Sequence, residues 1–207
     1  MASRLSVYNG ALRLLGCDQL QGLGDRREER VKLDEVWNDE FIKVVLAEGQ
    51  WNFAMRSVSL SYSPSLEPDF GLQYAFDRPT DCVRVSYFCS DGSFSSPIEN
   101  YQPELSYWFS DVDTIYVRYI SSDASYGGDI GKWPAFFAQF VEAHLACEVR
   151  QGITQSQVLL NELEVRRKQR LDKALSVDAM EAPTRRIRPG SWSTARTRGL
   201  GSREFLY

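Results

Sequence analysis

A chain of 207 residues with 43% hydrophobic and 25% charged residues can bury a sizeable core, and this composition excludes an intrinsically disordered protein. The net charge of −4 is unevenly distributed, because residues 183–207 carry +5 and residues 1–182 carry −9. No apolar run approaches the roughly 18 residues of a membrane helix, and the first residues lack the apolar core of a secretory signal, so we expect no membrane partner.

The N-terminal third predicts two helices. Ser3 can cap a first helix that ends at Gly16, with an apolar side formed by Leu5, Tyr8, Leu12 and Leu15. A long second helix should start at Asp25, because apolar residues recur in steps of three and four at Leu33, Trp37, Phe41, Val44, Val45 and Trp51. We expect Gly49 to end it in the left-handed conformation that glycine adopts without strain.

The middle of the chain has a different character. From 57 to 121 the apolar runs are short and alternating, and turn residues such as Pro64, Pro79 and Asp91-Gly92 separate them. The clearest predicted strands are 58–62, 82–88, 105–109 and 114–120. Five or six short strands of this kind indicate a small antiparallel sheet or sandwich.

Helical periodicity returns after Trp133-Pro134. Phe136, Phe140, Ala143 and Cys147 should share one face of a third helix that ends near Gly152. Thr154 can cap a fourth helix that runs to about Met180, with a narrow apolar line through Leu160, Leu163, Leu171 and Ala174.

This order of elements predicts an α+β fold. A four-helix bundle would comprise residues 1–56 and 122–182, a small antiparallel β domain would be inserted at 57–121, and residues 183–207 would form an extended C-terminal arm. We expect the core to include Leu12, Leu15, Trp37, Phe41, Trp51, Phe53, Phe136 and Phe140.

Candidate catalytic and metal-binding residues are few. His144 is the only histidine, and a single histidine on an amphipathic helix is more often a core or subunit-contact residue than a catalytic one. His144 and Cys147 have the spacing of half a metal site, but no second pair stands at ligand spacing. The four cysteines show no close pairing and predict reduced thiols. We therefore predict no catalysed reaction, no metal and no cofactor.

The C-terminal segment 183–207 has no periodicity and too few large apolar residues to form its own core. Its arginines surround Pro189-Gly190-Ser191-Trp192. Three interpretations compete: a disordered end, an arm that binds nucleic acid through phosphate contacts, or a segment that orders on a protein partner with Trp192 as its anchor.

Five stretches together resemble the head-to-tail adaptors of tailed bacteriophages, the family that includes the tail tubular protein A of short-tailed phages. They are Tyr8-Asn9-Gly10-Ala11-Leu12-Arg13-Leu14-Leu15-Gly16, Glu48-Gly49-Gln50-Trp51-Asn52-Phe53-Ala54-Met55-Arg56, Tyr74-Ala75-Phe76-Asp77-Arg78-Pro79-Thr80-Asp81-Cys82-Val83-Arg84-Val85, Val117-Arg118-Tyr119-Ile120 before Trp133-Pro134, and Arg188-Pro189-Gly190-Ser191-Trp192-Ser193-Thr194-Ala195-Arg196. Their order covers nearly the whole chain.

The resemblance implies a structural virion protein at the head-tail junction, assembled in the host cytoplasm. About twelve copies would form a closed ring below the portal protein. The β domain would meet tail fibre or tail nozzle proteins, and DNA would pass through the lumen without sequence-specific binding. The portal-binding residues would be Arg185, Arg186, Arg188, Pro189, Gly190, Trp192, Arg196 and Arg198. The alternative is a nucleic-acid-binding protein that uses this basic arm.

Overall fold

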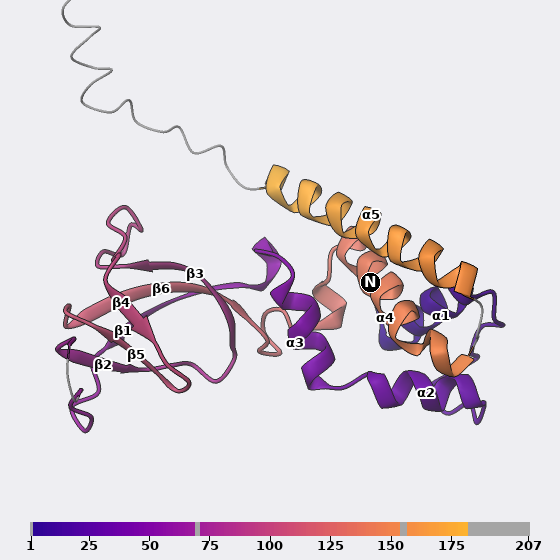
Figure 1. Ribbon diagram of the computed structural model, residues 1–207, viewed down its shortest axis with the longest axis horizontal. Helices are drawn as coiled ribbons and strands as arrows, with labels where there is room; N and C mark the ends of the chain where they lie inside the picture. Colours follow the sequence, from indigo (N-terminus) through magenta and orange to yellow (C-terminus); the bar gives the residue numbers. More distant parts are fainter. Residues whose placement is uncertain (1, 69–70, 154–156, 182–207) are drawn as a thin grey trace, which may run out of the picture.

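The computed structural model describes residues 2–68, 71–153 and 157–181, and it shows a mixed α+β protein (Figure 1). Four helices gather at one end of the molecule: α1 (Arg4–Leu15), α2 (Glu28–Val36), α4 (Ala135–Ile153) and α5 (Gln157–Glu181). The strands lie at the other end, and α3 (Asp39–Ala47) lies between the two groups. Because the described residues contain five α-helices, the predicted helix count of four is wrong.

Helix α1 spans Arg4–Leu15, as its capping residues predict. The Ser3 side chain accepts a hydrogen bond from the Ser6 backbone amide, and the Ser6 side chain accepts one from the Ser3 amide. Gly16 follows with φ of 76°, the left-handed conformation that closes a helix. The helix packs on α4.

The predicted long second helix is in fact two helices, α2 over Glu28–Val36 and α3 over Asp39–Ala47. Trp37 and Asn38 have extended backbones, and the Asn38 side chain accepts a hydrogen bond from the Phe41 amide at 2.7 Å. Asparagine side chains compete with helical hydrogen bonding and favour this capping position. The apolar periodicity of the sequence therefore continues although the helix itself is interrupted.

Gly49 also differs from its predicted role. Helix α3 ends at Ala47, and Gly49 is not among the left-handed glycines of the described residues. A Cβ atom on Gly49 would lie 2.7 Å from Leu175 Cδ2 on α5 and 2.7 Å from the Trp51 ring. The position therefore needs a glycine because another helix and a large ring approach its backbone closely.

The chain enters the strands through a 3₁₀ turn, η1, at Asn52–Ala54. The strands are β1 Met55–Ser61, β2 Tyr74–Asp77, β3 Cys82–Cys89, β4 Tyr101–Pro103, β5 Tyr107–Ser110 and β6 Thr114–Ser121. The four clearest predicted strands correspond to β1, β3, β5 and β6, whereas the two shortest strands, β2 and β4, were not singled out.

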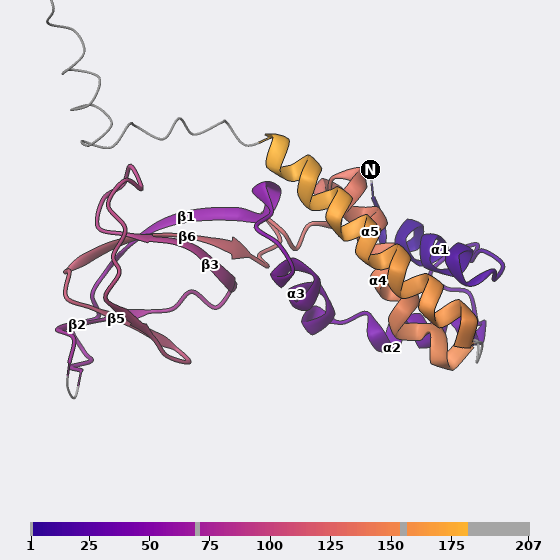
Figure 2. The ribbon, with the colours of Figure 1, turned by 45° about the horizontal axis from the view of Figure 1, so that its top comes forward.

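Two antiparallel three-stranded sheets form, with the strand orders β1-β6-β3 and β2-β5-β4. Figure 2 shows them as two layers. Their facing side chains make a separate apolar cluster. In it the Phe88 ring stacks on the Tyr101 ring, with 4.2 Å between the ring centroids, and meets the Trp108 ring edge-on, with 5.8 Å between the centroids. The β region is thus a small sandwich with its own core.

A turn, η2 at Ile130–Lys132, leads into α4 over Ala135–Ile153. Trp133 before the helix is buried, and its indole Nε1 donates to the Gly127 carbonyl at 2.8 Å. Helix α5 spans Gln157–Glu181 and lies along α4 (Figures 1 and 2). The predicted cap Thr154 lies outside the described residues.

The helices share one core with a few strand residues such as Ile120. Among the side chains predicted to be in the core, Leu12, Leu15, Phe41, Trp51 and Phe140 are buried, while Trp37 and Phe53 are partly buried against them. Val44, placed on the same predicted face, is 54% exposed.

Phe136 is wrongly predicted as a core residue, because it is 39% exposed and lies near the Lys173 ammonium. Phe137 is buried in its place and meets Trp51 at 4.8 Å and Trp133 at 5.1 Å. Helix α4 is covered by α1, α2 and α5, so its buried stripe is wider than a single line of residues four apart.

Replacing Phe140 by Ala should lower the free energy of unfolding by about 3–5 kcal/mol, since the residue is fully buried and leaves a cavity. The matched change Phe136→Ala one turn earlier should cost less than about 1 kcal/mol, mainly its cation–π contact. Urea denaturation of both variants checks this. Equal losses would contradict the assignment of the buried face.

The break between α2 and α3 is tested at its cap. Asn38→Ala should destabilise the protein by about 0.5–2 kcal/mol because the Phe41 amide loses its acceptor, whereas Asn38→Ser should retain most of the stability. Thermal unfolding of the pair gives the comparison. An Ala variant as stable as the parent would indicate that a continuous helix forms at no cost.

Candidate functional site

The predicted portal-binding residues, Arg185 to Arg198, lie outside the described residues. The structure instead describes the helix that leads to them, α5, and the way that helix is held. Its buried apolar contacts are few: Leu163 and Ala174 are the members of α5 in the helical core among the side chains described. Polar contacts therefore do much to fix the position of α5 against its neighbours.

Several polar contacts hold α5 along its length, and Arg167, Arg170 and Asp178 make the shortest of them. Arg167 Nη1 donates to Glu48 Oε1 at 2.7 Å, just after α3. Arg170 Nη1 donates to the Gln139 carbonyl of α4 at 2.7 Å. Near the end of the helix, the Asp178 carboxylate accepts the Asn52 backbone amide at 3.0 Å, and the Asn52 side chain donates to the Asp178 carbonyl at 2.7 Å.

The Asn52–Asp178 contact places the last turns of α5 against η1, where the chain passes from helices to strands. Figures 1 and 2 show this end of α5 near the middle of the molecule, close to the turn that leads into β1. Residues 183–207 therefore follow a helix end that lies at the joint between the helices and the sandwich. Sequence periodicity does not reveal this, because Asn52 and Asp178 are ordinary polar residues.

The joint has a second polar centre at Asp81, just before β3. Its carboxylate accepts hydrogen bonds from Arg56 Nη1 on β1 at 3.0 Å, from the Tyr119 hydroxyl at 3.2 Å and from the Ser121 hydroxyl. Burial alone would raise the pKa of Asp81, but the bonds from Ser121 and Arg56 outweigh it and hold the pKa below its ordinary value. Asp81 thus links the strands that enter and leave the helical region.

A polar hollow of about 870 Å³ lies between α3, α4 and α5. His144 forms part of its wall and is 7% exposed. The ring Nδ1 lies 3.2 Å from Arg167 Nη1 and 3.4 Å from Glu48 Oε1, and Nε2 lies 3.8 Å from Glu148 Oε1. This geometry suits a neutral ring with its proton on Nε2, so that Nδ1 accepts from the Arg167 guanidinium.

The pKa directions of His144 and Cys147 do not favour a reactive thiolate–imidazolium pair in this hollow. Burial lowers the pKa of His144, with the Arg167 charge acting in the same direction, although Glu48 and Glu148 oppose them. Burial raises the pKa of the Cys147 thiol in the same wall. A reactive thiolate beside an imidazolium needs the opposite shifts. Within the described part of the chain, no group of three or more His, Cys, Asp or Glu residues could hold a metal ion.

No family model matches the chain, and no curated protein matches it. None of the helices in the described ranges is both long and apolar enough to cross a bilayer. Neither periodicity nor capping signals predicted the polar contacts of α5 and Asp81, although Asn52 and Asp81 both stand in stretches on which the expected resemblance rests.

Stability should depend on His144 at mildly acidic pH. Its folded-state pKa lies below the ordinary value of 6.5, so below that pH the unfolded chain binds more protons at this residue than the folded chain. The stabilisation from the neutral ring is complete above pH 6.5 and is lost as the pH falls through the folded-state pKa.

His144→Asn keeps an acceptor for Arg167 but does not titrate. Between pH 7 and pH 5, the parent should therefore lose more unfolding free energy than this variant, as measured by urea denaturation at each pH. The groups around the ring (Glu48, Glu148 and Arg167) are present in both proteins and serve as the internal control. If the unfolding free energies of the two proteins fell in parallel between pH 7 and pH 5, the assignment of a neutral His144 ring would be contradicted.

Proposed function

We propose that this chain is a structural head-to-tail adaptor of a tailed phage virion that catalyses no reaction. About twelve copies would form a ring that joins the portal protein to the tail and lets DNA pass during ejection. Tail nozzle and tail fibre proteins would be the partners on the β side. The protein would assemble in the host cytoplasm and would lie at the head-tail junction of the finished virion.

The observation that carries the proposal is where the stretches shared with the phage adaptors lie. In the stretch that includes Trp51 and Asn52, Trp51 is buried under α4, and Asn52 binds the end of α5. Asp81 lies in a second such stretch and makes the part-buried contacts described above, and Trp133 lies in a third and makes a buried one. The resemblance thus involves the joints of the fold, which gives it more weight than scattered identities would have.

The arrangement of the two regions is consistent with such a role. Strand β1 leaves the helices at Met55, and β6 returns to them after Ser121, so the sandwich projects from the helical end (Figure 1). We propose that the helices form a bundle that packs side by side in the ring, while the sandwich reaches towards the tail. The net charge of −9 over residues 1–182 would suit a lumen that repels DNA phosphates and lets DNA slide.

The C-terminal arm would attach each copy to the portal. Its residues Arg185, Arg186, Arg188, Pro189, Gly190, Trp192, Arg196 and Arg198 offer one large aromatic anchor and several cations. Ordering such a segment is costly, so each single attachment should be weak. Around a ring, many copies bind together, and this multivalency would make the assembly stable.

The proposal is tested by mixing the purified protein with portal and measuring the mass of the complex. The parent should add about twelve copies. A variant that ends at Ala182 should keep its melting temperature and fail to attach. Trp192→Ala should weaken attachment by about 2 kcal/mol or more, as expected for a buried aromatic anchor, whereas Arg196→Ala should cost at most about 1 kcal/mol.

The parent and the variant that ends at Ala182 also distinguish the adaptor proposal from the alternative, a nucleic-acid-binding protein. The six arginines of residues 183–207 favour that alternative. An arm that binds DNA should show log affinity that falls steeply with log salt, and the truncated variant should lose that binding. An adaptor arm should bind portal and show little DNA affinity at physiological salt. Attachment of the truncated variant to portal with full retention of the genome would exclude the arm as the docking element.

A further inference from the structure

The sandwich, residues 57–121, carries a net charge of −6, which is most of the −9 carried by residues 1–182. Residues 57–121 contain nine carboxylates and three arginines. Each arginine is already engaged within the structure: Arg78 donates to the Cys82 carbonyl, Arg84 to the Ala47 carbonyl and Arg118 to the Ser57 hydroxyl. The exposed carboxylates of the sandwich are therefore available to an external cation, and the most basic part of this chain is residues 183–207.

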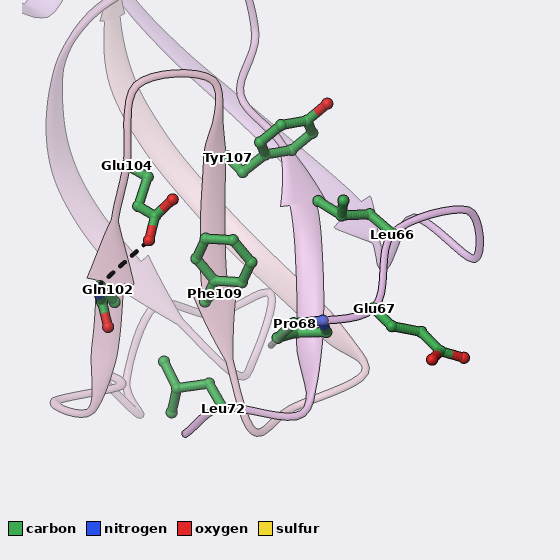
Figure 3. A pocket seen from close by; sticks show the side chains of 8 residues that line it. All are labelled: Leu66, Glu67, Pro68, Leu72, Gln102, Glu104, Tyr107 and Phe109. Carbon is green, nitrogen blue, oxygen red and sulfur yellow. Dashed lines mark hydrogen bonds between the residues drawn. The ribbon is translucent and has the colours of Figure 1, made fainter. Parts of the chain in front are cut away.

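A hollow of about 300 Å³ lies on the outer face of the β2-β5-β4 sheet (Figure 3). Trp108 and Ser110 of β5 are buried towards the sandwich core, so the alternate residues Tyr107 and Phe109 face outwards. Leu66, Pro68 and Leu72, from the connection between β1 and β2, also line the hollow. We call this feature the sheet hollow.

Two carboxylates border the sheet hollow. Figure 3 shows Glu104 on one side of the Phe109 ring and Glu67 on the other. Glu104 lies 3.5 Å from the Gln102 amide nitrogen, and neither glutamate forms a salt bridge with any residue in the described ranges. Leu105, next to Glu104 at the tip of the β4–β5 hairpin, is 91% exposed. An aromatic floor between two uncompensated carboxylates suits an aromatic side chain that has a cation on each side.

We propose that Trp192 of the same chain occupies the sheet hollow, with Arg188 and Arg196 pairing with the two glutamates. These arginines stand four residues before and four residues after Trp192, about 13 Å away on each side in an extended chain. The cavity volume is at the small end of ligand sites and suits a single indole. The net charges, −6 for residues 57–121 and +5 for residues 183–207, are complementary.

The proposed contact requires an extended segment. Trp192 follows Glu181, the last residue of α5, by eleven positions, and an extended chain of that length spans about 36–40 Å. The end of α5 lies at the joint from which the sandwich projects, and the β2-β5-β4 sheet is the layer farther from that end (Figures 1 and 2). The segment would therefore pass around the edge of the sandwich to reach the sheet hollow.

The consequence is a self-masking arm. While Trp192 lies in the sheet hollow, it is not available to another partner, and a partner with a better pocket would have to displace it. The contact does not depend on portal being that partner. It would shield a basic, aromatic segment from premature binding to nucleic acid or to other copies.

The test is the rate of trypsin cleavage after Arg196 in the full-length protein. The double change Glu67→Lys with Glu104→Lys should speed cleavage about tenfold, because it removes both acidic partners. The matched control, Glu35→Lys with Glu40→Lys, makes the same change in net charge on exposed residues of α2 and α3 and should leave the rate unchanged. Far-ultraviolet circular dichroism checks that both proteins are folded.

A second pair of variants tests the anchor from the other side of the contact. Trp192→Ala should speed cleavage after Arg196 about as much as the double glutamate change, whereas Phe205→Ala in the same segment should not. Equal rates in the parent, Trp192→Ala and the double glutamate variant would overturn the proposal. Protection that grows with protein concentration would also overturn it, because the segment would then bind another copy.

Discussion

The burial of Trp51 is the contact on which the rest of the structure depends. Its side chain is 1% exposed and meets Phe137 at 4.8 Å and Phe140 at 6.3 Å on α4. The residue stands between α3 and β1, so its burial sets the point from which the strands leave the helices. Gly49 leaves room for the Trp51 ring and for Leu175, which lets α5 pass directly over this turn. The start of the sandwich and the end of α5 are therefore held by one packing arrangement.

Helix α5 is attached in a different way from the other helices. Few of its described side chains are buried, and Arg167, Arg170 and Asp178 provide its specific contacts with α3, α4 and η1. Exposed ion pairs contribute little, but Arg167 shares Glu48 with a buried histidine, and Arg170 is bonded to a backbone carbonyl. The position of α5 is thus sensitive to protonation and to charge changes, whereas α1 and α4 depend on apolar packing.

The two proposals assign different surfaces to the same segment. In the adaptor proposal, residues 183–207 attach each copy to a portal ring, and affinity comes from many weak contacts made together. In the self-masking proposal, the same aromatic anchor rests in a small hollow on the acidic sandwich of its own chain. The two states would exclude each other, because one indole cannot occupy both sites. Such competition would delay attachment until a multivalent partner is present.

The sequence by itself determined the elements whose signals are local. Ser3 and Gly16 predicted the bounds of α1, and alternating apolar runs predicted β1, β3, β5 and β6, because capping and strand alternation depend on neighbouring residues. Only the tertiary structure decided that Asn38 breaks the second helix, that Phe137 and not Phe136 is buried, and that Gly49 accommodates α5. The polar contacts of Asp81, Arg167 and Asp178 were likewise invisible, since their partners lie 23 or more positions away in the chain. Periodicity shows that a residue has an apolar side, but the elements packed against that side decide how deeply it is buried.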